Sequence, residues 1–146
     1  MKAFYAGSFN PFTIGHYSVA RRAMNMFPYL FIGVGINESK NHIAHTEENI
    51  VRIEKLFEKD TNVKVMAYTG LTARVALEQG AGVLIRGVRN AFDFEKEKEL
   101  ADINLKIFGM PTIFIPADPD LAFISSSMVR ELSHFGFDVE RFLPSK

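Results

Sequence analysis

The sequence contains no cysteine among its 146 residues, which excludes a disulfide framework and a zinc site built from thiolates. It also has no surplus of charge, because 17 basic residues balance 17 acidic ones. A protein that coats nucleic acid or binds an anionic membrane needs a basic surplus, so we expect neither partner. A local basic pocket for one phosphorylated metabolite is compatible with this balance.

Long apolar runs are absent as well. No segment approaches the roughly 20 apolar residues of a membrane-spanning helix. The N-terminal segment has one lysine, Lys2, and a short apolar run that stops at Gly7, too short and too polar for a signal peptide. We therefore expect a soluble, cytoplasmic protein.

Two nucleotide-binding signatures are also missing. No Walker A segment occurs, and residues 80–82 begin like a dinucleotide fingerprint but have Ile85 where the third glycine belongs. His42, His45 and His134 do not have ligand spacing with a carboxylate cluster. The sequence therefore predicts no metal site built by protein side chains.

Short apolar runs alternate with helical periodicities along the whole chain. Strands are predicted at residues 3–6, 30–34, 63–67, 83–86 and 112–115, and helices at 14–27, 46–57, 71–79, 92–108 and 125–135. Thr46 is the predicted N-cap of the second helix. Continuously apolar strands are typical of a sheet covered on both faces, so we predict one doubly wound α/β domain, residues 1–146, with a five-stranded parallel Rossmann-like sheet.

Ligands of such folds bind beyond the carboxyl ends of the strands, near the point where strand order reverses. Polar or unusual residues follow four of the predicted strands, at residues 8–16, 37–40, 86–90 and 118–127. We expect these segments to meet at one edge of the sheet.

The turn at residues 7–16 reads Gly-Ser-Phe-Asn-Pro-Phe-Thr-Ile-Gly-His. Gly7 permits a tight bend, Ser8 and Thr13 supply hydroxyl groups, and the free N–H groups of the following helix favour an anion. His16 is placed to stabilise charge on a transferring phosphoryl group. The alternative is an ordinary strand-to-helix turn with a surface histidine.

Two further segments have the chemistry of anion sites. Arg86 and Arg89 flank Gly87 at a strand end, where each meets either an anion or a carboxylate such as Asp93 or Glu97. The serines at residues 125–127 exceed the single N-cap that a helix needs, although a plain serine-rich cap is the alternative. Arg130, one turn further on, is placed to reach back, and Lys40 lies in the polar loop after the second strand.

Together these segments resemble the phosphopantetheine adenylyltransferase family, a branch of the nucleotidyltransferases that share a (T/H)xGH signature. That signature reads Thr-Ile-Gly-His at residues 13–16. The family's Ile-Arg-Gly-Leu-Arg segment matches residues 85–89, and its Asp-Phe-Glu-x-Glu run matches residues 93–97. Its Ile-Ser-Ser-Ser/Thr-x-Val-Arg/Lys-Glu segment matches residues 124–131, and its loop lysine matches Lys40.

The resemblance implies adenylyl transfer from ATP to 4′-phosphopantetheine, which gives dephospho-coenzyme A and pyrophosphate in bacterial coenzyme A biosynthesis. The substrate phosphate attacks the α-phosphorus in line without a covalent enzyme intermediate, so catalysis consists of positioning and charge stabilisation. Mg²⁺ is expected to arrive with ATP. A homohexamer and feedback binding of coenzyme A are further expectations from the resemblance.

Residue roles follow from the same resemblance. The expected catalytic residues are His16, Lys40 and Arg86. The expected phosphopantetheine site comprises Ser8, Lys40, Thr72 and Arg86. The expected ATP site comprises Ser8, Phe9, His16, Gly87, Val88, Arg89, Glu97, Leu121, Ala122, Phe123, Ile124, Ser125, Ser126 and Ser127.

The chain departs from the family pattern at several positions. Asn10 replaces an Asp, Asn49 replaces an Arg, and Asn90 and Ala91 change the loop before Asp93. The family's C-terminal helix is expected to be short or absent. Two alternatives stay open: a cytidylyltransferase or nicotinate-mononucleotide adenylyltransferase with the same fold, and a nucleotide-binding module without activity.

Overall fold

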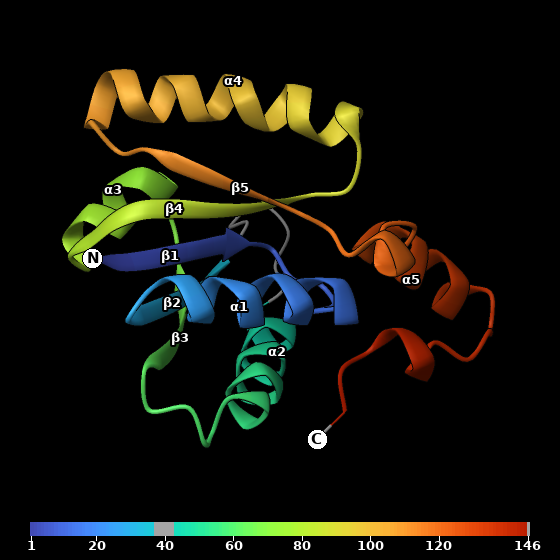
Figure 1. Ribbon diagram of the computed structural model, residues 1–146. Helices are drawn as coiled ribbons and strands as arrows, with labels where there is room; N and C mark the ends of the chain where they lie inside the picture. The colour runs from blue at the N-terminus through green and yellow to red at the C-terminus, as the bar shows by residue number, and fades with distance from the viewer. Residues whose placement is uncertain (37–42, 146) are drawn as a thin grey trace.

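The computed structural model describes residues 1–36 and 43–145 and contains a five-stranded parallel sheet with helices on both faces (Figure 1). This confirms the predicted fold class. The strands are β1 (Lys2–Gly7), β2 (Tyr29–Gly35), β3 (Val63–Tyr68), β4 (Ala81–Val88) and β5 (Thr112–Pro116). The helices are α1 (Ile14–Met26), α2 (Ile43–Leu56), α3 (Thr72–Glu78), α4 (Ala91–Phe108) and α5 (Ser126–His134), with 3-10 turns η2 (Pro119–Leu121) and η3 (Glu140–Phe142).

The order of strands across the sheet is β3-β2-β1-β4-β5, with every neighbouring pair parallel. The chain builds outward from β1 through β2 to β3, then returns to the other side of β1 for β4 and β5. The reversal of strand order therefore lies between β1 and β4, and the carboxyl ends of these two strands mark the expected ligand site.

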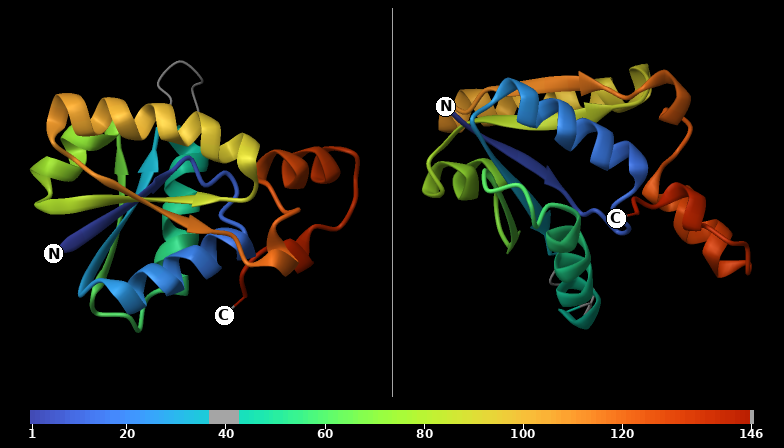
Figure 2. Two further views of the ribbon diagram at one scale, coloured as in Figure 1. Left: turned by 45° about the horizontal axis from the view of Figure 1, so that its top comes forward. Right: turned by 60° about the horizontal axis from the view of Figure 1, so that its bottom comes forward.

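Helices α1 and α2 cover one face of the sheet, and α3 and α4 cover the other (Figure 2). Because successive side chains of a strand point to opposite faces, Tyr5 of β1 packs with Val19 of α1 and Ile53 of α2. Its neighbour Phe4 packs with Ala76 of α3 on the opposite face. The continuously apolar strands are thus explained by burial from both sides.

The start of α2 is one boundary that the sequence prediction placed wrongly. The helix begins at Ile43, so Thr46 lies inside its first turn and is not the N-cap. Residues 43–46 contain no proline or glycine that would prevent the helix from starting earlier. Across residues 1–36 and 43–145, no helix combines the length and hydropathy needed to cross a membrane.

Candidate functional site

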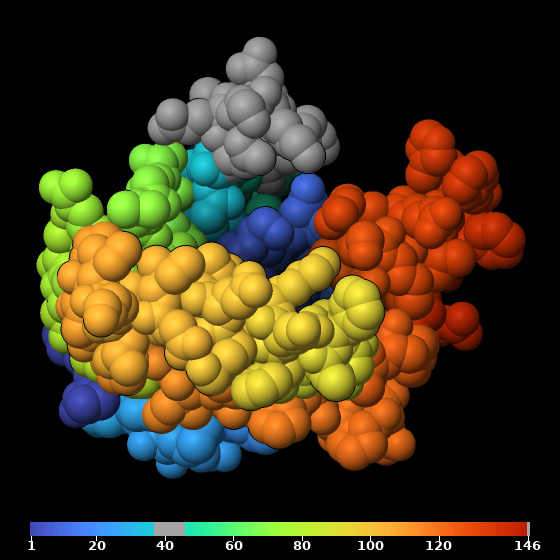
Figure 3. All heavy atoms as spheres, turned by 90° about the horizontal axis from the view of Figure 1, so that it is seen from above, coloured from blue at the N-terminus to red at the C-terminus, as the bar shows by residue number. Residues whose placement is uncertain are grey.

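A cavity of about 310 Å³ opens at the carboxyl ends of β1 and β4. We call this cavity the switch-point pocket. Three segments far apart in the sequence line it: the turn between β1 and α1 with the first residues of α1, the end of β4, and residues 117–130 around the start of α5. Figure 3 shows the surface hollowed between the start of α4, in yellow, and the C-terminal segment, in orange-red. The predicted meeting of polar segments at one sheet edge is confirmed for these three.

Most of the predicted site residues lie at this pocket. Those that line it are Ser8, His16, Gly87, Val88, Arg89, Leu121, Ile124, Ser125, Ser126 and Ser127. Those that do not line it are Phe9, Thr72, Arg86, Glu97, Ala122 and Phe123. Lys40 lies outside the described residues.

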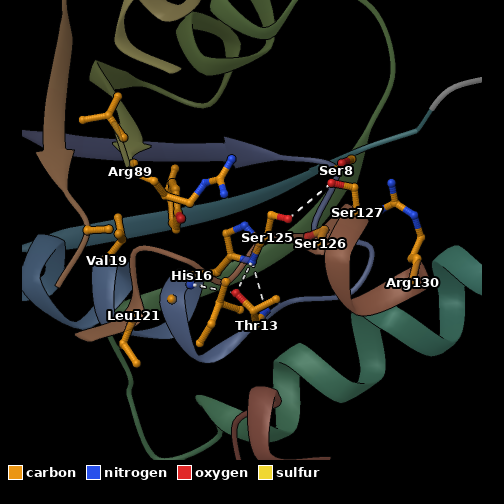
Figure 4. A pocket seen from close by; sticks show the side chains of 16 residues that line it. Ser8, Thr13, His16, Val19, Arg89, Leu121, Ser125, Ser126, Ser127 and Arg130 are labelled. Atoms are coloured by element: carbon orange, nitrogen blue, oxygen red, sulfur yellow. Dashed lines mark hydrogen bonds between the residues drawn. The ribbon is translucent and has the colours of Figure 1, made fainter. Parts of the chain in front are cut away.

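Figure 4 shows that the lining is polar at one end and, apart from Arg89, apolar at the other. Ser8, Ser127 and Arg130 gather at one end, and Val19 and Leu121 lie at the opposite end. A nucleotide has the same division, with phosphates at one end and a flat base at the other.

Sequence reasoning missed three lining residues: Tyr5, Val19 and Ala117. Tyr5 and Val19 lie in an apolar strand and on the apolar face of α1, so their sequence signal is that of core residues. Ala117 directly precedes the predicted polar segment after β5 and has no chemistry of its own. Only the packing of α1 against β1 and β4 brings Val19 and Tyr5 to the pocket.

The β1–α1 turn (residues 8–13) has a strained backbone at Phe9, whose φ of 47° lies in the left-handed region. The Phe9 side chain is 2% exposed, and its ring covers Gly7, where an added Cβ would lie 2.7 Å from a ring carbon. Asn49 of α2 donates a hydrogen bond from its side-chain amide to the Phe9 carbonyl, at 2.7 Å. Asn49, which stands where the family has an arginine, therefore holds the strained Phe9 peptide in place.

Two contacts join the same turn to α5, more than a hundred residues away in the sequence. The Ser126 hydroxyl donates to the Pro11 carbonyl at 2.8 Å, and Arg130 donates to the Asn10 carbonyl. Arg130 therefore reaches to the β1–α1 turn, whereas its predicted reach back to an anion at the start of α5 stays a prediction. Because Asn10 accepts through its backbone, an aspartate in its place would supply the same acceptor.

The His16 ring is locked by a capping box at the start of α1. The Thr13 N–H donates to Nδ1 of His16 at 2.9 Å, and the His16 N–H donates to the Thr13 hydroxyl at 3.3 Å. Because Nδ1 accepts, the neutral ring carries its proton on Nε2. Phe12 stacks on the imidazole at 5.6 Å between centroids, and Phe9 meets it edge-on at 5.0 Å.

Burial lowers the pKa of His16 to about 4, and the charges of Arg86 and Arg89 lower it further in the same direction. At neutral pH the imidazole is therefore uncharged. It offers an N–H donor of fixed orientation to the pocket rather than an imidazolium.

The three serines at the start of α5 make different contacts. Ser125 caps the helix by accepting from the Met128 N–H at 3.1 Å, and its hydroxyl lies 3.3 Å from that of Ser127. Ser126 is used in the bond to the β1–α1 turn, while Ser127 is exposed and lines the pocket. One serine therefore caps the helix, as predicted, and a second positions another segment.

Both arginines of the β4 end are paired with carboxylates of α4. Arg86 donates to the two oxygens of Glu97, each at 2.7 Å, and also to the Ala6 carbonyl. Arg89 pairs with Asp93, with 3.1 Å between Nε and Oδ2. The ion-pair alternative from the sequence is thus present at both positions. Three of the five N–H groups of Arg86 are used, so two are left to donate to an anion.

The comparisons with known proteins agree with this geometry. The model of the cytidylyltransferase-like family matches residues 4–132. The phosphopantetheine adenylyltransferase of Phocaeicola vulgatus is 48% identical over 143 residues, which cover 98% of this chain and 95% of that protein. The protein of the same name from Porphyromonas gingivalis is 42% identical over 97% of this chain and 93% of its own length.

The chain belongs to the phosphopantetheine adenylyltransferase family.

A solved structure of another nucleotidyltransferase has the same fold as this chain, although the two sequences differ widely. The bifunctional NMN adenylyltransferase/ADP ribose pyrophosphatase of Francisella tularensis superposes with a TM-score of 0.73 at 13% identity. The match covers 99% of this chain and 45% of that one. The α/β architecture around the switch-point pocket is therefore that of nucleotidyltransferases.

Proposed function

We propose that the protein transfers the adenylyl group of ATP to 4′-phosphopantetheine, giving dephospho-coenzyme A and pyrophosphate. A phosphate oxygen of phosphopantetheine attacks the α-phosphorus of ATP, and the bond from that phosphorus to the bridging oxygen of pyrophosphate breaks. The observation that carries the proposal is the meeting of three motif segments of this family at one pocket. The Thr13 hydroxyl lies 3.1 Å from Nδ1 of His16, but Thr13 is 1% exposed and its hydroxyl accepts from the His16 N–H in the capping box. It is therefore not presented to a substrate as a nucleophile, which accords with direct transfer.

His16 is the proposed centre of charge stabilisation. Its Nε2–H would donate to an oxygen of the transferring phosphoryl group, in an orientation set by Thr13. A neutral donor suits this role, since it gains hydrogen-bond strength as negative charge develops in the transition state.

The acceptor phosphate is proposed to bind Ser8, Lys40 and Arg86. Ser8 lines the pocket, and Arg86 keeps two N–H groups beyond its bonds to Glu97 and Ala6. Thr72 starts α3 and lies 2.8 Å from the Tyr68 hydroxyl, away from the switch-point pocket. We propose that it contacts the pantetheine arm, which extends beyond the phosphate.

The nucleotide is proposed to lie along the pocket, with its phosphates toward the start of α5. The N–H groups of that helix start and the hydroxyls there supply neutral donors, and Arg89 supplies charge. Both oxygens of Glu97 accept from Arg86, so its proposed contribution is to hold Arg86 at the site. The proposed ATP set is completed by Ser8, Phe9 (through its backbone), His16, Gly87, Val88, Leu121, Ala122, Phe123, Ile124, Ser125, Ser126 and Ser127.

Mg²⁺ is proposed to enter with ATP, held by phosphate oxygens and water. Within the described part of the chain no group of three His, Asp or Glu residues could hold a metal ion. The ion would neutralise phosphate charge, while the protein orients the reacting groups. A cytoplasmic location is proposed with this chemistry, since both substrates are soluble metabolites.

The protein is also proposed to form a homo-oligomer, with a hexamer as the specific expectation. Helix α4 has no buried residue in the single chain. Its exposed apolar side chains include Phe92 at 73%, Leu100 at 55% and Ile107 at 67%. Apolar surface of this extent on one helix favours a protein–protein contact. Coenzyme A, which contains the pantetheine arm, is proposed to compete for the same site.

The test is pyrophosphate release measured with ATP and 4′-phosphopantetheine, together and singly. We expect release only when both substrates are present. Nicotinate mononucleotide and CTP serve as alternative acceptor and donor. Turnover with either of them, without turnover of the pair ATP and 4′-phosphopantetheine, would remove the assignment.

A further inference from the structure

The Tyr5 hydroxyl is a polar group of the switch-point pocket that the proposed function leaves unused. Tyr5 is 3% exposed, and its ring packs between the sheet and α1 and meets Phe9 edge-on at 5.0 Å. Its hydroxyl lies 3.7 Å from the position of a Cβ added to Gly87, next to Val19. Tyr5, Gly87 and Val19 all line the pocket.

No hydrogen-bond partner of this hydroxyl exists among residues 1–36 and 46–145. A buried tyrosine normally places its O–H on a partner, since an unpaired buried hydroxyl is costly. Burial also raises the pKa of Tyr5, against the opposing influence of the Arg86 and Arg22 charges, so the phenol keeps its proton. The hydroxyl therefore faces the pocket as a donor, free to bond to water or to a ligand there.

The position of Tyr5 in the pocket indicates which part of a nucleotide it meets. Val19 and Leu121 lie at the apolar end, opposite Ser8, Ser127 and Arg130 (Figure 4). Tyr5 adjoins Val19 and Gly87. The apolar end suits a base and its ribose, and the serine end suits phosphates.

We propose that the Tyr5 hydroxyl donates a hydrogen bond to an acceptor atom of the base or ribose of the bound nucleotide, as a further specificity-determining group. This inference rests on the proposed function for the identity of the nucleotide. Arg22 lies nearby and donates to the Pro116 carbonyl at 2.7 Å, but it does not line the pocket. It adds positive charge that favours an acceptor atom, without touching the ligand.

Calorimetric titration of Tyr5→Phe with ATP, AMP and tripolyphosphate tests the proposal. Loss of one neutral hydrogen bond weakens binding by roughly 3- to 10-fold, and we expect this for ATP and AMP alike. Tripolyphosphate, which lacks base and ribose, should bind both proteins equally. The melting temperature of the ligand-free variant should not fall, because the hydroxyl has no partner in the chain to lose.

Tyr17→Phe is the matched control. The Tyr17 hydroxyl accepts from Arg21 Nε at 2.9 Å and does not line the pocket. Its removal should lower the melting temperature and leave nucleotide binding unchanged. This separates loss of a structural hydroxyl from loss of a ligand-binding one.

Wild-type affinity of Tyr5→Phe for ATP and AMP would overturn the proposal, as would an equal loss of affinity for tripolyphosphate. A wild-type protein that turns over no phosphopantetheine, yet binds ATP more tightly than Tyr5→Phe does, would overturn the proposed reaction and support the role of Tyr5. The two failures are therefore distinguishable.

Discussion

The two walls of the switch-point pocket are held by different kinds of interaction. On the wall formed by the β1–α1 turn, side chains donate to backbone carbonyls: Asn49 to Phe9, Arg130 to Asn10 and Ser126 to Pro11. On the wall formed by the end of β4, arginines pair with carboxylates of α4: Arg86 with Glu97 and Arg89 with Asp93.

The first wall therefore determines the shape of the pocket, and the second wall determines its positive charge. Bonds to carbonyls fix the path of the turn and the orientation of His16, and their strength depends little on salt. The ion pairs hold positive charge ready at the other wall, where a phosphate must share the arginines with their carboxylates. Substitutions on the first wall should therefore change geometry and turnover, and those on the second should change affinity and its dependence on salt.

The largest expected effect is that of His16→Ala on turnover. Loss of one positioned donor to developing charge lowers kcat on the order of 10²- to 10³-fold. The KM for ATP should change little, since the helix start and Arg89 are left intact. Steady-state pyrophosphate release measures both constants. His134→Ala, an exposed histidine at the end of α5, is the control. A turnover of His16→Ala within twofold of wild type would refute the role of His16.

The second effect is a loss of stability at acid pH that His16 causes. The folded pKa of about 4 lies below the model value of 6.5, so the unfolded chain binds this proton first as pH falls. Stability from the neutral ring is fully present above pH 6.5 and is lost between pH 6.5 and 4. At pH 5 the loss is about 2 kcal/mol.

Urea unfolding at pH 7 and pH 5 measures this loss. His16→Gln is the reference variant, because glutamine at this position preserves the capping box and does not titrate. The wild type should lose more stability than the variant over this interval. Equal losses in the two proteins would show that His16 titrates normally in the folded state.

The third effect concerns the ion pairs of the second wall. Glu97→Gln leaves Arg86 without its carboxylate, and the cost is on the order of 1–2 kcal/mol because the pair is only partly buried. The side chains of Arg86 and Glu97 are 32% and 16% exposed. The KM for 4′-phosphopantetheine should rise because Arg86 is no longer held in place, and it should depend more steeply on salt concentration because the site gains net positive charge.

Asp93→Asn is the companion variant for the more exposed pair with Arg89. Asp93→Asn should lower stability less than Glu97→Gln does. It should raise the KM for ATP rather than the KM for 4′-phosphopantetheine. If Glu97→Gln instead raised the KM for ATP and Asp93→Asn raised the KM for 4′-phosphopantetheine, Arg86 would be assigned to ATP and Arg89 to phosphopantetheine.

The smallest effect is expected for Asn49→Ala. Removal of the donor to the Phe9 carbonyl costs about 1 kcal/mol in stability. Because the strained peptide is then less well held, kcat should fall several-fold while the KM for ATP changes less. Asn62→Ala removes an amide-to-carbonyl bond of the same type but longer and weaker, to Pro28 at 3.5 Å, far from the pocket. If both variants lose stability but neither loses turnover, Asn49 has a structural role only.

The double variant Asn10→Asp/Asn49→Arg restores the family pattern and sharpens this test. Neither Asn49→Arg nor Asn10→Asp alone preserves the net charge of the chain, whereas the double variant does. Activity above that of both single variants would show that the two asparagines compensate for one another.

The sheet and its helices were predictable because burial on both faces leaves continuous apolar runs. The capping signals of α4 and α5 were equally local: Asn90 accepts from the Asp93 N–H, and Ser125 accepts from the Met128 N–H. The start of α2 was not predictable, since residues 43–46 carry no signal that distinguishes helix from loop. Where the local sequence allows both helix and loop, tertiary contacts decide where the helix begins.

The sequence by itself determined the fold class and the motifs that supply the pocket, because periodicity, caps and residue chemistry are local properties. Only the tertiary structure decided which residues meet. It placed Tyr5 and Val19 at the pocket and paired Arg86 with Glu97. It also brought the Asn49 amide to the carbonyl of the strained Phe9 peptide. It also joined Arg130 to the Asn10 carbonyl, 120 residues away in the chain. The formation of these contacts depends on the order of strands in the sheet, which no local pattern encodes.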